Sequence, residues 1–312
     1  MKIKISELKE LCVSKLIHNL SREEAEIVFE DFLYGEAAGI KSHGFISFQG
    51  NVMGKVGLKE KELEIVKETS SCTIINGNKG LGHLIGRKAL EFAAKKASEG
   101  IAISGMFNTT SWLMPGIIAR EGAKKGMITL VMNNAKARTA PYGGVKARTG
   151  TNPLSIGLPL KTPFILDMAT SIRAMGQVRL AKKLGIELEE IGYDADGNET
   201  NDADKIMSLK PFGGYKGYGL NLFIELFSGL VGKMGSDLKK GWDRGYMIIC
   251  INPSAFGNLE DYQERTEKLI SEVKSEEGVR IPGERAEANY LKVIASGEIE
   301  IDDKILEDIK GL

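Results

Sequence analysis

Residues 72–133 read CTIINGNKGLGHLIGRKALEFAAKKASEGIAISGMFNTTSWLMPGIIAREGAKKGMITLVMN, and this segment shows the rhythm of the whole chain. Short runs rich in β-branched residues alternate with longer stretches of helical periodicity. Three runs fit strands and the two stretches between them fit helices: 72–76, 101–107 and 127–133, then 83–98 and 116–125. This alternation predicts an α/β fold with a largely buried sheet.

The pattern continues outward from this segment on both sides. Toward the C-terminus we expect strands at 153–159, 164–170 and 246–252, and helices at 172–184, 218–233, 260–276 and 286–297. The stretch 218–233 is strongly apolar, which favours a buried helix. Residues 6–38 fit two helices, and the second opens with the capping-box pattern Ser21-Arg22-Glu23-Glu24. We therefore expect a central α/β domain, 71–257, with N-terminal helices (1–70) packed against C-terminal helices (258–312).

Composition excludes several classes of function. Lys+Arg and Asp+Glu are equal at 42 each, so no net field attracts nucleic acid or an anionic membrane. No apolar run reaches the roughly 20 residues that span a bilayer, and the N-terminus is unlike a signal peptide. Cys12, Cys72 and Cys250 are scattered, as reduced cytosolic thiols are, and their spacing is not that of a metal site. We expect a cytoplasmic protein without a metal site.

The tripeptide Ser42-His43-Gly44 lies in a polar, glycine-flanked segment between a helix and a new element. The chain has only three histidines, and an unperturbed imidazole titrates near pH ~6.5, so His43 is the first candidate for proton transfer near neutral pH. The alternative is an ordinary histidine of a surface loop.

Two glycine-rich segments precede predicted helices. The first, Gly80-Leu81-Gly82-His83-Leu84-Ile85-Gly86, has the wrong spacing for a dinucleotide fingerprint, and we interpret it as a tight turn with His83 on the first helical turn. The second, Pro211 to Gly219 (PFGGYKGYG), places four glycines around Lys216. Backbone amides, a helix N-terminus and a lysine can bind a phosphate there. A flexible connection is the alternative.

Two further motifs accompany the later strands. The run Asp167-Met168-Ala169-Thr170-Ser171 ends a strand, and ligands bind at the carboxyl ends of strands in α/β sheets. Asp167 could orient a ring or a hydroxyl, or it could cap a helix, for which Ser171 is an equally good residue. The run Gly150-Thr151-Asn152-Pro153 fits a turn into a strand.

Together these motifs resemble the malate/L-lactate dehydrogenase family, of the L-sulfolactate and ureidoglycolate dehydrogenase type. The matching segments occur in family order along almost the whole chain. They are SHG (42–44), GLGHLIGRKA (80–89), PYGG (141–144), GTNP (150–153), DMATS (167–171), PFGGYKGYG (211–219), GYMIICINPSAF (245–256) and PGE (282–284).

The resemblance implies an NAD(P)-dependent oxidoreductase that acts on small 2-hydroxy or 2-oxo acids, or on related imino acids. It implies a homodimer with its active site near the subunit interface, and a mixed sheet without the usual dinucleotide fingerprint. His43 would be the proton donor and acceptor. The residues that would line the cofactor are Asp167, Met168, Ala169, Thr170, Ser171, Lys216, Gly217, Gly283, Glu284 and Arg285.

The chain departs from the family at two substrate contacts. Ser47 stands where the family places an arginine, four residues after the histidine, and Ser111 stands where it places a second histidine. Ser42, Ser47, Ser111 and Lys136 are the candidate substrate-binding residues. Because a serine cannot replace the charge of a guanidinium, the carboxylate needs another cation, and Lys41, Lys136, Arg138 and Arg148 lie in segments that could supply it. Trp112 and Met114 would make this wall bulkier and more apolar.

Three hypotheses follow from the motifs that match the family and the two positions that differ from it. The first is an active dehydrogenase with a shifted substrate preference. The second is a cofactor-binding relative that has lost catalysis, because the arginine and the second histidine are missing. The third is an unrelated enzyme that binds a phosphate ligand through Lys216. No ribose-reading acidic residue or arginine can be assigned, so the cofactor is NAD or NADP.

Overall fold

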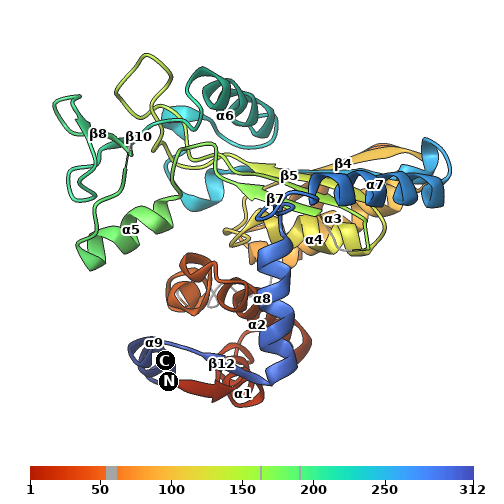
Figure 1. Cartoon of the computed structure of the whole chain (residues 1–312), viewed down its shortest axis with the longest axis horizontal. Coiled ribbons are helices and arrows are strands. Elements are labelled where there is room, and N and C mark those ends of the chain that lie inside the picture. Colours follow the sequence, from red (N-terminus) through yellow and green to blue (C-terminus); the bar gives the residue numbers. More distant parts are fainter. Residues whose placement is uncertain (54–61, 162–163, 190) are drawn as a thin grey trace.

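The central element of the computed structural model is a seven-stranded sheet (Figure 1), and the structure describes residues 1–53, 62–161, 164–189 and 191–312. The strand order is β2-β3-β4-β11-β5-β6-β7. Their bounds are Glu64–Glu68, Cys72–Asn76, Ile101–Phe107, Gly245–Ile251, Ile128–Asn133, Leu154–Leu158 and Phe164–Met168. Strands β3 and β4 run parallel and every other neighbouring pair is antiparallel. The predicted mixed α/β sheet is therefore confirmed.

Alternation along the central strand β11 explains how both faces of the sheet are covered. Tyr246, Ile248 and Cys250 point into one core, which they share with α3 (Gly82–Lys96) and α4 (Pro115–Lys124). Met247 points the opposite way, into a smaller core under α6 (Tyr215–Ser228). This period of two is what a strand buried on both faces requires.

The two ends of the chain lie together, on the side of α3 and α4 away from the sheet (Figure 1). Strand β1 (Lys2–Lys4) pairs with β12 (Glu298–Glu300), and α1 (Ile5–Leu16) and α2 (Arg22–Ala37) share a core with α9 (Asp303–Lys310). Helix α8 (Glu284–Ser296) packs against α2, whereas α7 (Leu259–Val273) lies beside the sheet, where Gln263 donates to the Pro159 carbonyl at 3.2 Å. The domain boundaries near residues 70 and 258 stay a prediction.

The apolar helix predicted at 218–233 differs from the expectation in two respects. It spans Tyr215–Ser228, and its polar residues Asn221 and Glu225 are buried beside Ile224, while Phe223 and Leu226 are 51% and 56% exposed. The prediction of a buried apolar helix therefore holds for the side of Ile224, which packs in the core under α6, and was wrong for the outer side. The physical reason is that the inward side also carries a hydrogen-bond network, which leaves Phe223 and Leu226 on the outer face.

Short elements built by distant pairing were not predicted. They include β1, β12, α9, and a small sheet in which β8 (Gly192–Tyr193) lies between β9 (Glu199–Thr200) and β10 (Ser208–Leu209). Helix α5 (Met175–Leu184) begins three residues later than predicted. It starts later because Ser171 still forms a β-bridge with Pro211.

Candidate functional site

His43 ends a 3₁₀ turn, Lys41–His43, that follows α2 directly. The turn folds back closely onto the helix: a Cβ atom on Gly44 would lie 2.1 Å from Glu36 Oε2. The backbone N–H of Phe45 donates to the same carboxylate at 3.1 Å. Gly44 is therefore needed for this close approach, and His43 is held half-buried at the surface of α2.

The neighbouring serines orient the imidazole. Ser42 Oγ lies 3.1 Å from Nδ1 of His43, and Ser47 Oγ donates to the Ser42 carbonyl at 2.9 Å. Nδ1 thus has a protein partner, while Nε2 has none among the residues that the structure describes. Burial, and secondarily the charge of Arg179, lower the pKa of His43 below its ordinary value. Ser47 stabilises the loop through its backbone contact.

Asp167 lies at the end of β7 and faces the start of α4. The backbone N–H of Gly116 donates to its carboxylate, which favours the charged form, but the surrounding protein raises the pKa of Asp167 to about 7. The side chain is nevertheless exposed to solvent, and water opposes that rise. Asp167 therefore combines an upward pKa shift with access to a ligand from solvent.

The next residues of this strand end, Met168 to Ser171, turn progressively inward. Met168 and Ala169 are half-buried, whereas Thr170 and Ser171 are buried. Thr170 Oγ1 donates to the Asn152 carbonyl at 2.8 Å, and Ser171 Oγ donates to the Arg173 carbonyl at 2.7 Å. Both hydroxyls are thus engaged with the protein. The alternative role of Ser171 as a helix cap was wrong, because the N-cap residue of α5 is Ala174.

Predicted segments contact both ends of β7, which spans Phe164–Met168. The Phe212 N–H donates to the Thr170 carbonyl at 3.2 Å, which attaches the PFGGYKGYG segment. The Ile165 N–H donates to the Pro282 carbonyl at 3.1 Å, which attaches the Gly283 turn near the start of β7, at the opposite end from DMATS. On the other side, a Cβ on Gly176 of α5 would lie 2.7 Å from Ser42 Cβ, so the His43 loop rests on the helix that follows DMATS.

The candidate cofactor residues fit an anionic dinucleotide. Lys216 is exposed on the first turn of α6, after Gly213 and Gly214 with φ of 55° and 64°. Such a start leaves backbone N–H groups free for phosphate. Arg173 Nε is buried without a hydrogen-bond partner, and Arg285 is exposed on the first turn of α8. An orphaned guanidinium donor next to a strand end suits an anionic ligand.

Two of the remaining cofactor candidates have structural partners. A Cβ on Gly217 would lie 1.9 Å from the Phe212 carbonyl oxygen, so this glycine permits the turn to close. Glu284 forms an ion pair with Lys274 and accepts the Ile281 N–H at 3.1 Å, and the pair with Lys274 lowers its pKa. Gly283 precedes it with φ 87°.

The expected apolar wall beside Ser111 is not formed. Trp112 and Met114 are each 2% exposed and lie in the two main cores, and Trp112 Nε1 donates to Asn133 Oδ1 at 3.0 Å. That interpretation was therefore wrong. Ser111 Oγ accepts the Leu113 N–H at 3.3 Å, and Lys136 is exposed.

The glycine segment 80–86 forms a packed turn, with His83 on the first turn of α3 as predicted. A Cβ on Gly82 would lie 2.3 Å from the Thr110 carbonyl oxygen. His83 is fully buried, and its Nδ1 lies 2.6 Å from Asp31 Oδ2, which also binds Arg87. This histidine joins α3 to α2.

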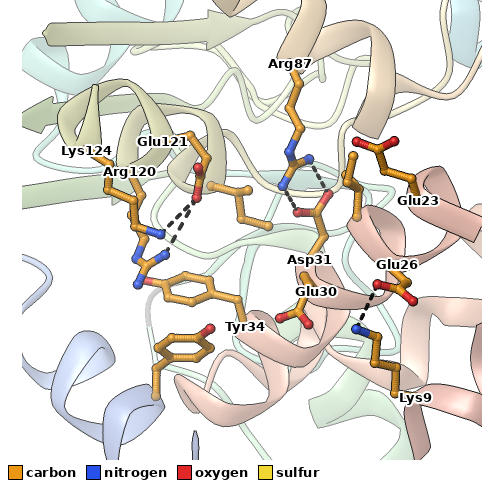
Figure 2. Close-up of a pocket in the computed structure, with 13 residues that line it drawn as sticks. Lys9, Glu23, Glu26, Glu30, Asp31, Tyr34, Arg87, Arg120, Glu121 and Lys124 are labelled. Carbon is orange, nitrogen blue, oxygen red and sulfur yellow. Dashed lines mark hydrogen bonds and ion pairs between the residues drawn. The ribbon is translucent and has the colours of Figure 1, made fainter. Parts of the chain in front are cut away.

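A cavity lined by charged side chains lies away from His43. It measures about 400 Å³ and opens between α2, α3, α4 and α8 (Figure 2). Each lysine and arginine that lines it is already paired with a carboxylate: Lys9 with Glu26, Arg87 with Asp31, Arg120 with Glu287, and Lys124 with Glu121. Its cations are therefore engaged, and the cavity is not the candidate site.

Sequence reasoning missed the network that supports the PFGGYKGYG segment. Asn152 Nδ2 donates to Glu225 Oε2 at 2.7 Å, and Asn221 Nδ2 donates to the Gly150 carbonyl and to Thr170 Oγ1 at 2.9 and 2.8 Å. The turn GTNP is thus tied to α6 and to DMATS. The buried amides had one signal in the sequence, namely polar residues inside an apolar helix.

Comparison with known proteins establishes the class. The model of the malate/L-lactate dehydrogenase family matches residues 3–310. The structure is similar to that of sulfolactate dehydrogenase from Methanocaldococcus jannaschii, with a TM-score of 0.90, 30% identity, and coverage of 100% of this chain and 96% of that one.

Two relatives extend the match at the level of sequence. L-sulfolactate dehydrogenase from Methanothermobacter thermautotrophicus is 33% identical over 94% of this chain and 91% of its own. The NAD(+)-dependent ureidoglycolate dehydrogenase of Escherichia coli is 29% identical over 98% of this chain and 94% of its own. The chain belongs to the malate/L-lactate dehydrogenase family and is an oxidoreductase, as its motifs predicted. The matches do not support a relative without catalysis or an unrelated phosphate enzyme.

No helix within residues 1–53, 62–161, 164–189 and 191–312 is both long and apolar enough to cross a bilayer. No group of three or more His, Cys, Asp or Glu side chains within the same residues is arranged to hold a metal ion.

Proposed function

We propose that this chain catalyses reversible hydride transfer between NAD or NADP and a small 2-hydroxy/2-oxo acid, or a related imino acid, with His43 as the proton carrier. One observation carries the proposal. The histidine of an SHG turn packs, through Ser42, on the helix that leaves the DMATS strand end, to which the PFGGYKGYG segment is also attached. Family membership supplies the reaction class.

His43 is suited to proton transfer in both directions. Its Nδ1 is oriented by Ser42 Oγ, so Nε2 is the atom that would exchange the proton with the substrate oxygen. In the reducing direction the imidazolium donates a proton to the developing alkoxide, and in the oxidising direction the neutral ring removes it. The lowered pKa favours the neutral ring, which is the form that oxidation needs.

The cofactor would be held along β7 by groups that bind its charge. Lys216 and the N-terminus of α6, Arg173 and Arg285 would bind phosphates, and Met168 and Ala169 would contact the rest of the molecule. When bound, a nicotinamide ring supplies or accepts the hydride. Asp167 would hold its neighbouring group by a hydrogen bond. Ser42, Ser47, Ser111 and Lys136 are the remaining candidates for contact with substrate.

The exposed apolar side chains of α6 favour a homodimer. Phe223 and Leu226 are 51% and 56% exposed on the outer face of α6, and Leu230, two residues beyond its end, is 71% exposed. Apolar side chains gathered on one outer face mark an interaction surface, and a second copy is the partner proposed. The active site would then lie near the subunit interface, because α6 carries Lys216.

We further propose a cytoplasmic location and the predicted division into two units. Cys12 and Cys250 are buried free thiols, and burial raises their pKa values to about 12 and about 11, so they are inert in a reducing compartment. The residues 1–70 and 258–312 would form the helical unit and 71–257 the sheet unit.

A substrate panel with each cofactor tests this function. The protein is assayed with NADH and NADPH against pyruvate, oxaloacetate, sulfopyruvate and a cyclic 2-imino acid. We expect turnover of at least one of them, and we expect His43→Ala to reduce kcat by about 100-fold or more. His18→Ala is the control. His18 is exposed and lies before α2, whereas His43 lies after that helix. Absence of turnover with every substrate, or an active His43→Ala variant, would refute the proposal.

A further inference from the structure

The site as described lacks a cation for the substrate's carboxylate. Ser47 occupies the place of the family arginine, and its hydroxyl is engaged by the Ser42 carbonyl. Lys41 is exposed beside the turn, where its charge acts on the Glu36 carboxylate. A small 2-oxo acid is held by its carboxylate, for which a planar guanidinium is the best partner.

Helix α5 provides an arginine on the side that faces His43. The backbone of α5 touches the His43 turn at Gly176, where an added Cβ would lie 2.7 Å from Ser42 Cβ. Arg179 follows Gly176 by three residues, so the two lie on the same face of the helix, one turn apart. The absence of a side chain on Gly176 lets the helix approach the turn.

The charge of this arginine acts on the imidazole. Helices α2 and α5 both pack against the turn. Glu36 of α2 approaches it at Gly44, Arg179 lies on the face of α5 that carries Gly176, and Lys41 is on the turn itself. Burial is the larger cause of the lowered pKa of His43, and Arg179 is the charged residue that contributes to it.

The guanidinium of Arg179 is also available to bind a ligand. Its side chain is exposed, and none of its atoms forms an ion pair or hydrogen bond with the residues that the structure describes. The next cation on the helix, Lys182, is instead paired with Asp204 at 2.8 Å. An exposed, unpaired guanidinium beside a catalytic imidazole is available for an anion from solution.

We infer that Arg179 binds the carboxylate of the substrate beside His43 and thereby replaces the arginine that Ser47 has displaced. The inference rests on the proposed function and adds the residue that selects acids over neutral carbonyl compounds. It also moves the cation from the histidine loop to α5, so the carboxylate would approach the imidazole from a different side.

Binding of the substrate carboxylate would then favour the protonated form of His43. In the free enzyme Arg179 disfavours the imidazolium. A bound carboxylate neutralises that charge, so the protonated form of His43 becomes easier to maintain when substrate is present. His43 would therefore be protonated mainly in the complex with substrate, where its proton is transferred.

The test compares Arg179→Met with Arg179→Lys and with Lys182→Met as the matched control. Lys182 is an exposed cation on the same helix, three residues further on. We measure KM and kcat for the best acid of the panel, Kd for NADH by fluorescence, and the His43 pKa by NMR with and without oxamate. His43→Gln assigns the resonance.

For Arg179→Met we expect KM for the acid to rise between about 10-fold and about 100-fold, as for loss of a charge-assisted hydrogen bond. We expect unchanged Kd for NADH, a raised pKa of free His43, and no further rise with oxamate. Arg179→Lys should be intermediate, and Lys182→Met should match the wild type.

An unchanged KM in Arg179→Met, or equal effects of Arg179→Met and Lys182→Met, would overturn the inference while leaving the function intact. If the wild-type protein binds NADH but reduces no acid of the panel, the proposed function fails instead. In that case the oxamate titration still decides the inference: an oxamate-induced rise in the His43 pKa that Arg179→Met abolishes supports it, and no rise in the wild type overturns it.

Discussion

At the scale of single residues, the environment of His43 sets the pH dependence of the reaction. Its pKa is lowered, first by burial and then by Arg179. Reduction needs the imidazolium, so kcat/KM for the oxo acid should fall as pH rises through this lowered value, already below the ordinary ~6.5. Oxidation needs the neutral ring, so its rate should rise through the same pH. Rates of reduction and oxidation measured across pH give the pKa of the group responsible. A pKa at or above the ordinary value in both directions would contradict this expectation.

Two glycines of α6 give a matched pair for the anion-binding turn. Gly217→Ala would bring a Cβ to 1.9 Å from the Phe212 carbonyl oxygen, whereas Gly219 has no atom within 4 Å of that position. Gly217→Ala should lower Tm and weaken NADH binding, because the turn before Lys216 must open. Gly219→Ala should be neutral or add up to about 1 kcal/mol of helix stability. Thermal unfolding and a fluorescence titration measure both, and equal behaviour of the pair would refute the role of Gly217.

Some residues of the site can be read from the sequence and others cannot. The SHG and DMATS motifs are local patterns, and each ends an element in the structure as expected. Arg179 carries no local signal, because its relation to His43 depends on how α5 crosses the turn. The buried partners Asn152 and Glu225 are likewise 73 residues apart and meet only through the fold.

At the scale of elements, the outer face of α6 should hold two copies together. Leu226→Glu places a charge within the proposed interface and should shift the protein from dimer to monomer. Leu291→Glu on α8 is the control, since both leucines are 56% exposed. Sedimentation equilibrium distinguishes them. A Leu226→Glu variant that stays dimeric, or a wild type that is monomeric throughout, would refute the interface on α6.

Elements whose sequences show strong periodicity were predictable, and elements whose sequences show weak periodicity were not. Strands β3 and β4 have the predicted bounds, because their β-branched runs end at turn residues. Strand β2 is exposed throughout and has no apolar alternation to reveal it. The inward polar face of α6 was missed because apolar content does not say which side of a helix faces the core.

At the scale of the whole molecule, Asp31 connects the helical core to the sheet core. Burial raises its pKa, but the charge of Arg87 and the hydrogen bond of His83 outweigh burial, so the net pKa is below the ordinary value. The ionised pair therefore stabilises the fold above pH ~4, and that stabilisation is lost as pH falls through the lowered pKa.

Removing this carboxylate tests the connection. Asp31→Asn should lower the free energy of unfolding at neutral pH by about 3–5 kcal/mol, because it leaves Arg87 without its buried partner. The difference from wild type should shrink as pH falls toward 3. Glu26→Gln, in an exposed ion pair with Lys9, should change little. Urea unfolding across this pH range measures the effect, and a pH-independent difference would contradict the assignment.

The most direct measurement is a crystal structure of the protein with nicotinamide cofactor and oxamate. We expect His43 Nε2 within hydrogen-bond distance, about 2.6–3.2 Å, of the oxamate carbonyl oxygen, on the face of the nicotinamide ring from which hydride leaves. Placement of the nicotinamide out of reach of His43 in every copy, for example in the cavity beside Arg120, would contradict the assignment of His43 and with it the proposed mechanism.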